Sequence, residues 1–98
     1  MRVVAVGSRS FVLGFRLAGV GGVEVADAKD ALSVLNRLMN DPEIGLIILS
    51  EELTSEIRNE VNEVRSKKPM PLIYELPSSK AGARETDYRA LLRQVLGV

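Results

Sequence analysis

Short apolar segments with the character of β-strands alternate with segments of helical spacing along residues 3–76, and this alternation constrains the fold more than any other feature. Residues 3–6 (Val-Val-Ala-Val) form a continuous apolar run closed by Gly7, and residues 46–49 (Leu-Ile-Ile-Leu) form the strongest such run. Runs of this kind indicate strands that are buried on both faces of a sheet. Residues 22–25 predict a weaker strand, and residues 72–76 predict a fourth strand bracketed by prolines, as suits a sheet edge.

The segments between the strands predict three helices. Ser10 is expected to cap a short helix that runs through Ala18 and ends at Gly19. Asp27 is expected to cap the second helix, and Ser50 the third. The second helix has an apolar stripe of Ala28, Ala31, Leu32, Leu35, Leu38 and Met39. The third has a buried stripe of Leu53, Ile57, Val61 and Val64, with Glu56, Glu60 and Glu63 facing water.

This order of elements, βαβαβαβ, predicts an α/β fold with a four-stranded parallel sheet and helices on both of its faces. The expected strand order is 2-1-3-4, as in flavodoxin-like and receiver-like folds, because that order places the two most apolar strands at the centre. Residues 1–77 are expected to form this α/β body, and a chain of 98 residues is short enough to make one domain overall.

The end of the chain has a different character. Residues 78–84 (Ser-Ser-Lys-Ala-Gly-Ala-Arg) are small and polar, which predicts a flexible linker. Residues 85–98 predict a C-terminal helical tail whose apolar stripe consists of Tyr88, Leu91, Leu92, Val95 and Leu96. Two interpretations stay open: the tail folds back as the last helix of the body, or it leaves the sheet and lays its stripe on a partner protein.

The charge and residue composition excludes several classes of function. Thirteen basic residues balance thirteen acidic ones, so the chain lacks the net positive charge that is typical of nucleic-acid binding proteins. The absence of cysteine excludes disulfides and zinc–thiolate sites, and the absence of histidine removes the commonest general base. No apolar run approaches the roughly 20 residues of a membrane-spanning helix, so we expect a cytoplasmic protein without direct membrane insertion.

The loops that follow the predicted strands carry no recognised catalytic or cofactor-binding pattern. Gly7 stands alone where a dinucleotide-binding loop needs three spaced glycines, and residues 19–22 (Gly-Val-Gly-Gly) precede a strand rather than follow one. A receiver domain needs acidic residues after its first and third strands and a lysine after a later one. Those places hold Ser8, Ser50 and Pro77. We therefore expect no catalytic residue, no cofactor and no metal ion.

The segment from Phe11 to Val20 changes this picture. Its run Gly-Phe-Arg-Leu-Ala-Gly, residues 14–19, resembles the signature in the first helix of the F subunit of the archaeal and vacuolar-type (A/V-type) rotary ATPases. The first strand, the Gly-Leu-Ile-Ile-Leu strand that leads into an acidic helix, and residues 71–77 (Pro-Leu-Ile-Tyr-Glu-Leu-Pro) are similar to that family too. The polar linker and the ending Val-Leu-Gly-Val extend the resemblance over the full length of the chain.

The resemblance implies a mechanical role. The F subunit of that family is a non-catalytic part of the central stalk, or rotor, and binds the coiled-coil D subunit, which forms the shaft inside the catalytic A/B hexamer. It helps couple or regulate ATP synthesis, ATP hydrolysis and ion transport. Its location is then cytoplasmic, peripheral to the cell membrane as part of the complex. The alternative is a stand-alone receiver-like regulatory or protein-interaction domain that lacks phosphorylation chemistry.

Partner contacts are expected in two places. In the first helix the candidates are Gly14, Phe15 and Arg16; in the tail they are Tyr88, Leu91, Leu92 and Val95, through which the tail could reach the A/B hexamer. A glycine inside a helix costs about 1 kcal/mol relative to alanine, so close approach to the sheet or to a partner is expected at Gly14. For Arg16, an internal contact with a neighbouring loop and a contact with a partner are equally supported.

Overall fold

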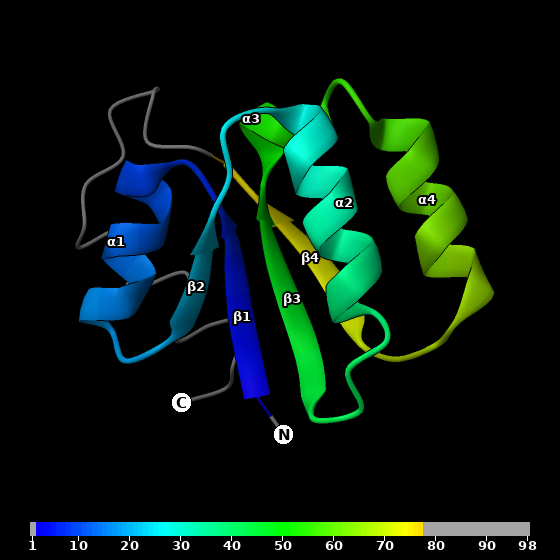
Figure 1. Ribbon diagram of the computed structural model, residues 1–98, viewed down its shortest axis with the longest axis horizontal. Helices are drawn as coiled ribbons and strands as arrows, with labels where there is room; N and C mark the ends of the chain where they lie inside the picture. Colours follow the sequence, from blue (N-terminus) through cyan, green and yellow to red (C-terminus); the bar gives the residue numbers. More distant parts are fainter. Residues whose placement is uncertain (1, 78–98) are drawn as a thin grey trace.

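The computed structural model describes residues 2–77, which fold around a parallel sheet of four strands (Figure 1). The strands are β1 (Arg2–Gly7), β2 (Gly21–Glu24), β3 (Ile44–Ser50) and β4 (Leu72–Leu76). Their order in the sheet is β2-β1-β3-β4, so the predicted fold class and the predicted order 2-1-3-4 are confirmed. The weak second strand starts and ends one residue earlier than the sequence indicated.

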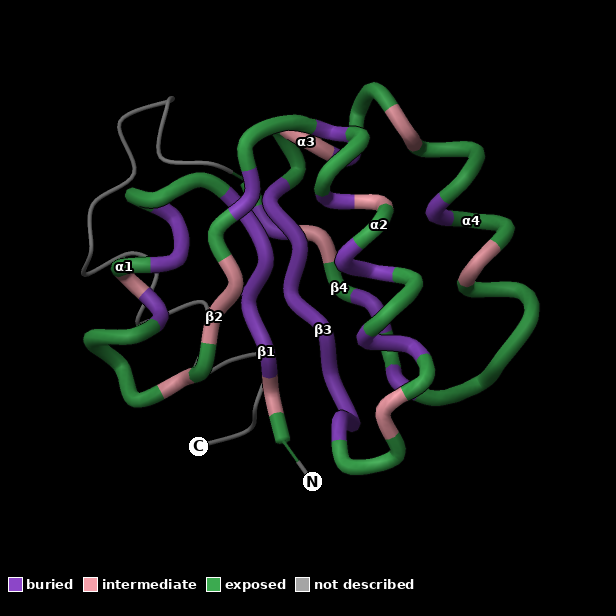
Figure 2. Tube along the Cα trace, in the orientation of Figure 1, coloured by how far each residue is buried: buried purple, intermediate pink, exposed green. Residues whose placement is uncertain are grey.

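The centre of the sheet is the most buried part of the body, as the continuous apolar runs predicted. All seven residues of β3 are buried, and four of the six residues of β1 are (Figure 2). Ala5 of β1 lies opposite Ile48 of β3, and both are fully buried. The edge strands β2 and β4 instead combine exposed positions with buried or half-buried ones.

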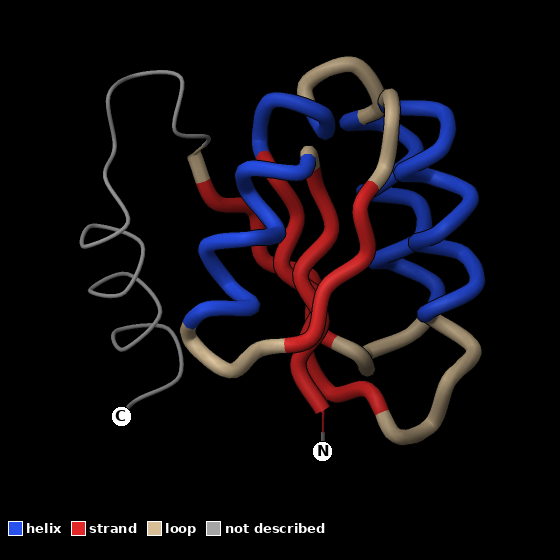
Figure 3. Tube along the Cα trace, turned by 60° about the vertical axis from the view of Figure 1, so that its left-hand side comes forward, coloured by secondary structure: helices blue, strands red, loops and turns tan. Residues whose placement is uncertain are grey.

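The helices cover the two faces of the sheet unequally (Figure 3). Helix α1 (Arg9–Leu17) packs on one face, where it shares an apolar cluster with Ala5, Leu46, Ile48 and Leu76. Helices α2 (Ala28–Leu38) and α4 (Arg58–Lys67), with the short α3 (Glu51–Thr54), lie on the other face over a larger cluster. This division follows from the right-handed crossovers that parallel neighbouring strands require.

The N-cap of α1 is Ser8 and not Ser10, which corrects the sequence prediction. The Ser8 hydroxyl accepts a hydrogen bond from the Phe11 N–H at 3.5 Å, and the Ser10 hydroxyl lies 3.3 Å from that of Ser8. Strand β1 ends at Gly7, so Ser8 is the first residue available to cap the helix, and Ser10 already lies in its first turn. At the other end the helix closes before Gly19, whose φ of 87° is the left-handed conformation that glycine adopts readily.

The predicted third helix is divided into α3 and α4, which corrects a second expectation. The Thr54 and Ser55 hydroxyls donate to the Glu51 and Glu52 carbonyl oxygens, and Ile57 leaves the helical conformation with φ −125° and ψ 30°. Such side-chain hydrogen bonds to the backbone compete with the helical ladder. The apolar stripe continues across the break, because Leu53, Ile57 and Val64 pack around the buried Val61. Ser50 occupies the N-cap position of α3, but its side chain makes no capping hydrogen bond.

Asp27 caps α2 as predicted. Its Oδ1 atom accepts from the Asp30 N–H at 2.8 Å, and the Asp30 carboxylate in turn accepts from the Ala26 N–H at 3.1 Å. We expect Asp27→Ala to lower the free energy of unfolding by about 1 kcal/mol, because the substitution removes the acceptor for an otherwise unpaired helix N–H. Urea unfolding measures this loss. Asp27→Asn keeps a side-chain acceptor and should lose less; an equal loss in both variants would contradict the capping role.

Polar contacts attach α4 to the edge strand β4. The Arg58 guanidinium pairs with the Glu75 carboxylate at 3.3 Å, and the Arg65 guanidinium donates to the Ile73 carbonyl oxygen at the same distance. The Met70–Pro71 peptide bond that leads into β4 is cis. The predicted linker 78–84 and tail 85–98 lie outside the described residues. Within residues 2–77 no helix has the length and apolar character needed to cross a membrane.

Candidate partner-binding surface

Helix α1 is amphipathic, and its buried side is aromatic. Phe11, Val12 and Phe15 are almost completely buried, and the two phenyl rings pack with centroids 4.9 Å apart at an angle of 49°. Phe15 is 0% exposed and belongs to the apolar cluster between α1 and the sheet. The candidate contact residue Phe15 therefore lies in the core, where it fixes the position of α1 and is not itself accessible to a partner.

Arg16 holds α1 against the edge of the sheet. Its Nη2 atom donates a hydrogen bond to the Gly22 carbonyl oxygen of β2 at 3.1 Å, while the residue as a whole is exposed. The internal contact expected for Arg16 is present, although it goes to a strand rather than to a loop. A contact of the exposed guanidinium with a partner stays a prediction. Gly14, the third candidate in this helix, is half-buried.

Gly22 allows α1 to approach β2 closely. A Cβ atom added at Gly22 would lie 2.5 Å from the Val12 Cγ1 atom, well inside van der Waals contact. The neighbouring Gly21 points to the opposite face of the sheet, where a Cβ atom would lie 3.8 Å from the Val3 carbonyl oxygen. The expectation that the Gly-Val-Gly-Gly run precedes a strand did not include this packing contact. Successive side chains of a strand point to opposite faces of the sheet. This alternation is the sequence signal that assigns Gly22 to the face covered by α1 and Gly21 to the other face.

The outer side of α1 carries an apolar ridge that the sequence analysis did not single out. Leu13 and Leu17 are 53% and 57% exposed, and residues four apart lie next to each other on a helix surface. The charge of this part of the body is positive, since residues 2–25 contain three arginines (Arg2, Arg9 and Arg16) and one acidic residue. The helical spacing of the sequence could have revealed the ridge, because it places Leu13 and Leu17 on the opposite side of the helix from Phe11 and Phe15.

Parallel sheets usually bind ligands at their carboxyl edge. At this edge an aromatic side chain, that of Phe11, fills the space beside Gly7 at the end of β1. A Cβ atom added at Gly7 would lie 2.5 Å from the Phe11 Cδ2 atom and 3.1 Å from the Ser50 Cβ atom. Ser50, in the place of a receiver domain's acceptor aspartate, is 2% exposed. In residues 2–77 no three histidine, cysteine, aspartate or glutamate side chains converge to hold a metal ion.

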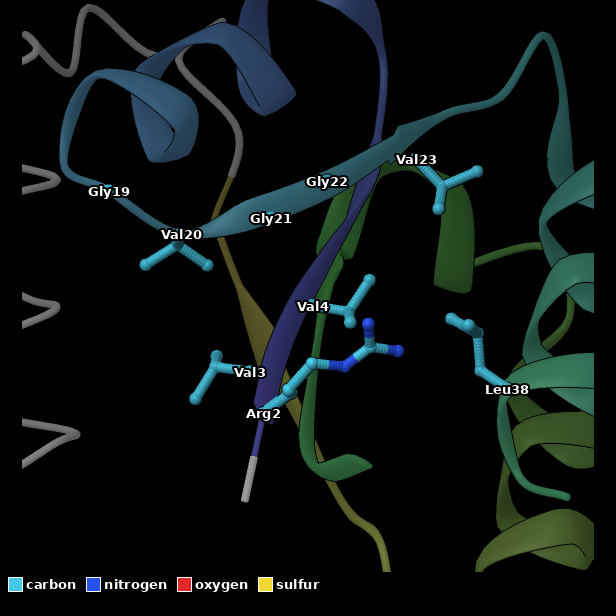
Figure 4. A pocket seen from close by; sticks show the side chains of 9 residues that line it. All are labelled: Arg2, Val3, Val4, Gly19, Val20, Gly21, Gly22, Val23 and Leu38. Carbon is cyan, nitrogen blue, oxygen red and sulfur yellow. The ribbon is translucent and has the colours of Figure 1, made fainter. Parts of the chain in front are cut away.

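A cavity of about 550 Å³ opens at the other end of the strands, beside β2 (Figure 4). We call this cavity the β2 groove; residues 2–4, residues 19–23 and Leu38 line it. The side chains of Val23 and Leu38 point toward each other across the groove, and the Arg2 side chain reaches up between Val4 and Leu38. The candidate contact residues of the tail, Tyr88, Leu91, Leu92 and Val95, lie outside the described residues.

Comparison of the amino-acid sequence with known proteins identifies the family of this chain. Residues 3–95 match the family of ATP synthase (F/14-kDa) subunits. The chain is 40% identical to the F subunit of the A-type ATP synthase of Methanococcus aeolicus, an alignment that covers 100% of this chain and 97% of that protein.

Two further relatives have the same name. The F subunit of the A-type ATP synthase of Methanothermobacter thermautotrophicus is 35% identical over 98% of this chain and 92% of its own length. That of Methanocaldococcus jannaschii is 31% identical over 100% of this chain and 97% of its own length. These matches extend across the whole body and the sequence that follows it. The chain therefore belongs to the ATP synthase (F/14-kDa) subunit family, as the F subunit of an A-type ATP synthase.

Proposed function

We propose that the chain is a non-catalytic part of the central stalk of an A/V-type rotary ATPase, where it binds the coiled-coil D subunit, called the shaft subunit below. In this role it helps to couple or regulate ATP synthesis or hydrolysis and ion transport. The full-length match to F subunits of A-type ATP synthases is the observation that carries the proposal. The protein then resides in the cytoplasm, peripheral to the cell membrane, as part of the complex.

The surface of α1 supports a role in binding another protein. The exposed Leu13–Leu17 ridge is apolar, and exposed apolar side chains next to arginine are typical of protein interfaces. Within residues 2–77 the Arg16 guanidinium donates through Nη2 to the Gly22 carbonyl, and a guanidinium has further donors that suit a carboxylate. At the carboxyl end of β1, by contrast, Phe11 fills the space beside Gly7.

Co-expression with the shaft subunit of the same enzyme tests the proposal. We expect the two chains to co-purify as a stable complex, and we expect Leu13→Asp to weaken the complex while Leu72→Asp, at a similarly exposed leucine of β4, serves as the matched control. Failure of the wild-type chain to bind the shaft subunit would contradict the proposal. Formation of a stable acyl phosphate with a phosphodonor and Mg²⁺ would favour the receiver-like alternative instead.

Truncation after Ser79 tests the proposed regulatory role of the tail. Residues 2–77 contain a four-stranded sheet with helices packed on both faces, so we expect the truncated chain to stay folded. Complex binding should weaken, or ATPase activity of the assembled enzyme should change. Circular dichroism and ATPase assays measure the two effects. Unfolding of the body on truncation would show that the tail is part of the core.

A further inference from the structure

The β2 groove has the size and lining of a binding cavity. Its volume of about 550 Å³ is within the range of roughly 300–1,000 Å³ that is usual for ligand sites. Val4, Val23 and Leu38 contribute apolar side chains to it from three different elements (Figure 4). The groove lies beside an edge strand, where a partner can approach without displacing a helix of the body. Apolar side chains of a partner could therefore enter it.

The free edge of β2 is poorly suited to the addition of another strand. The strand is four residues long, and the Val25 N–H just beyond it donates to the Gly7 carbonyl oxygen of β1 at 2.9 Å. Because backbone groups alternate in direction along a strand, the Gly22 carbonyl points away from β1. The Arg16 guanidinium already occupies that carbonyl at 3.1 Å. An occupied carbonyl on a short edge strand blocks strand pairing, so a partner would pack here through side chains, as a helix does.

Two arginines reach this edge from opposite faces of the sheet. Arg2 lies on the side of α2, where it pairs with Asp41 at 3.1 Å and keeps 59% of its side chain exposed. Arg16 lies on the side of α1. The acidic residue of β2, Glu24, directly follows Val23 and is not itself part of the lining. A helix that presents carboxylates on both sides of an apolar stripe would complement this arrangement.

Gly21 lines the groove and contributes no side chain to it. Its φ lies outside the left-handed region that glycine favours, and a Cβ atom there would make an ordinary contact of 3.8 Å with the Val3 carbonyl oxygen. Glycine within a strand is unfavourable unless close approach requires it. Gly22 meets that condition through Val12, whereas Gly21 faces the groove. As the first residue of β2, Gly21 leaves room for another molecule to approach the strand closely.

The geometry points to the β2 groove as the docking site for an acidic amphipathic α-helix of a partner. An apolar side chain of that helix packs against the half-buried Val23, and its carboxylates pair with Arg2 and Arg16. The assignment of this helix to the coiled-coil shaft subunit rests on the proposed function. In this arrangement the β2 edge of the sheet, which α1 and Arg2 reach from opposite faces, meets the shaft.

Gly21→Trp, which fills the groove, tests the docking site in the full chain. Calorimetric titration with the purified shaft subunit of the same enzyme should show binding weakened by about 30-fold or more, the scale of an interface hot spot. Asn59→Trp, at an exposed position on α4, should bind like the wild-type chain. Arg16→Gln should weaken binding and should reduce the dependence of the affinity on salt between about 0.1 and 0.5 M. Arg16→Lys keeps the positive charge and should restore part of the affinity and part of its salt dependence.

A second measurement does not depend on a bulky substitution. The chain has no cysteine, so Gly21→Cys and Asn59→Cys each introduce a unique thiol. A saturating concentration of the shaft subunit should slow maleimide labelling of Gly21→Cys by about tenfold or more and leave Asn59→Cys unaffected. Equal labelling of the two variants, or full affinity of Gly21→Trp, would overturn the docking site and leave the proposed function intact. Failure of the wild-type chain to bind the shaft subunit would overturn both.

Discussion

Phe15→Ala is expected to lower the free energy of unfolding by about 3–5 kcal/mol, a large part of the total stability of a body of this size. The Phe15 side chain is fully buried, and its ring packs against Phe11 at a centroid distance of 4.9 Å. Alanine leaves a cavity between α1 and the sheet that the surrounding side chains, buried in the same apolar cluster, fill only in part. Chemical denaturation followed by circular dichroism measures the loss.

Leu13→Ala is the matched control for Phe15→Ala, because it truncates another large apolar side chain of α1. Leu13 is 53% exposed on the opposite side of the helix, so we expect a change within about 0.5 kcal/mol. The two variants separate the core side of α1 from its outer side. Equal losses would show that the outer ridge is packed within the folded chain, and would contradict its proposed role in partner binding.

Gly22→Ala is expected to destabilise the fold by about 1–3 kcal/mol, the usual cost of inserting a methyl group into a packed core. The added Cβ atom would lie 2.5 Å from the Val12 Cγ1 atom, so α1 would have to move away from β2. That movement would also strain the hydrogen bond from Arg16 to the Gly22 carbonyl. Urea unfolding measures the loss, and hydrogen exchange at the α1 amides reports the movement.

The adjacent glycine provides the control for this variant. Gly21→Ala makes the same chemical change on the other face of β2, where space is available, and should leave stability unchanged or raise it by up to about 1 kcal/mol. Val12→Ala removes the atom that clashes, so Gly22→Ala should cost less in the Val12→Ala background than in the wild-type chain. A Gly22→Ala cost that is independent of Val12 would contradict the packing explanation.

The sheet could be predicted from the sequence because its signal is continuous and local. The apolar runs at residues 3–6 and 46–49 indicate central strands, and short right-handed connections then leave few topologies. The break between α3 and α4 could not be predicted in this way. The apolar stripe continues through Ile57, whereas the break coincides with Thr54 and Ser55, whose hydroxyl groups donate to backbone carbonyls. Periodicity of apolar residues carries no information about such bonds.

The motif Gly-Phe-Arg selected α1 as a candidate contact helix, which stays a prediction. It joined a core residue, Phe15, with an exposed one, Arg16. The spacing of Phe11, Val12 and Phe15 would have assigned Phe15 to the buried side. The β2 groove has no local signal, because Leu38 and Val23 come together only when α2 packs beside the edge of the sheet.

Because β3 is completely buried, the hydrogen exchange of its amides can serve as a reference for opening of the whole body. Each of its seven residues is shielded from solvent, and the strand is bonded to β1 on one side and to β4 on the other. Its amide protons can therefore exchange with deuterium only when the whole body opens, whereas those of the edge strand β2 exchange through local opening. Within an assembled complex, slowed exchange in β2 with unchanged exchange in β3 would distinguish binding at the edge from stabilisation of the entire protein.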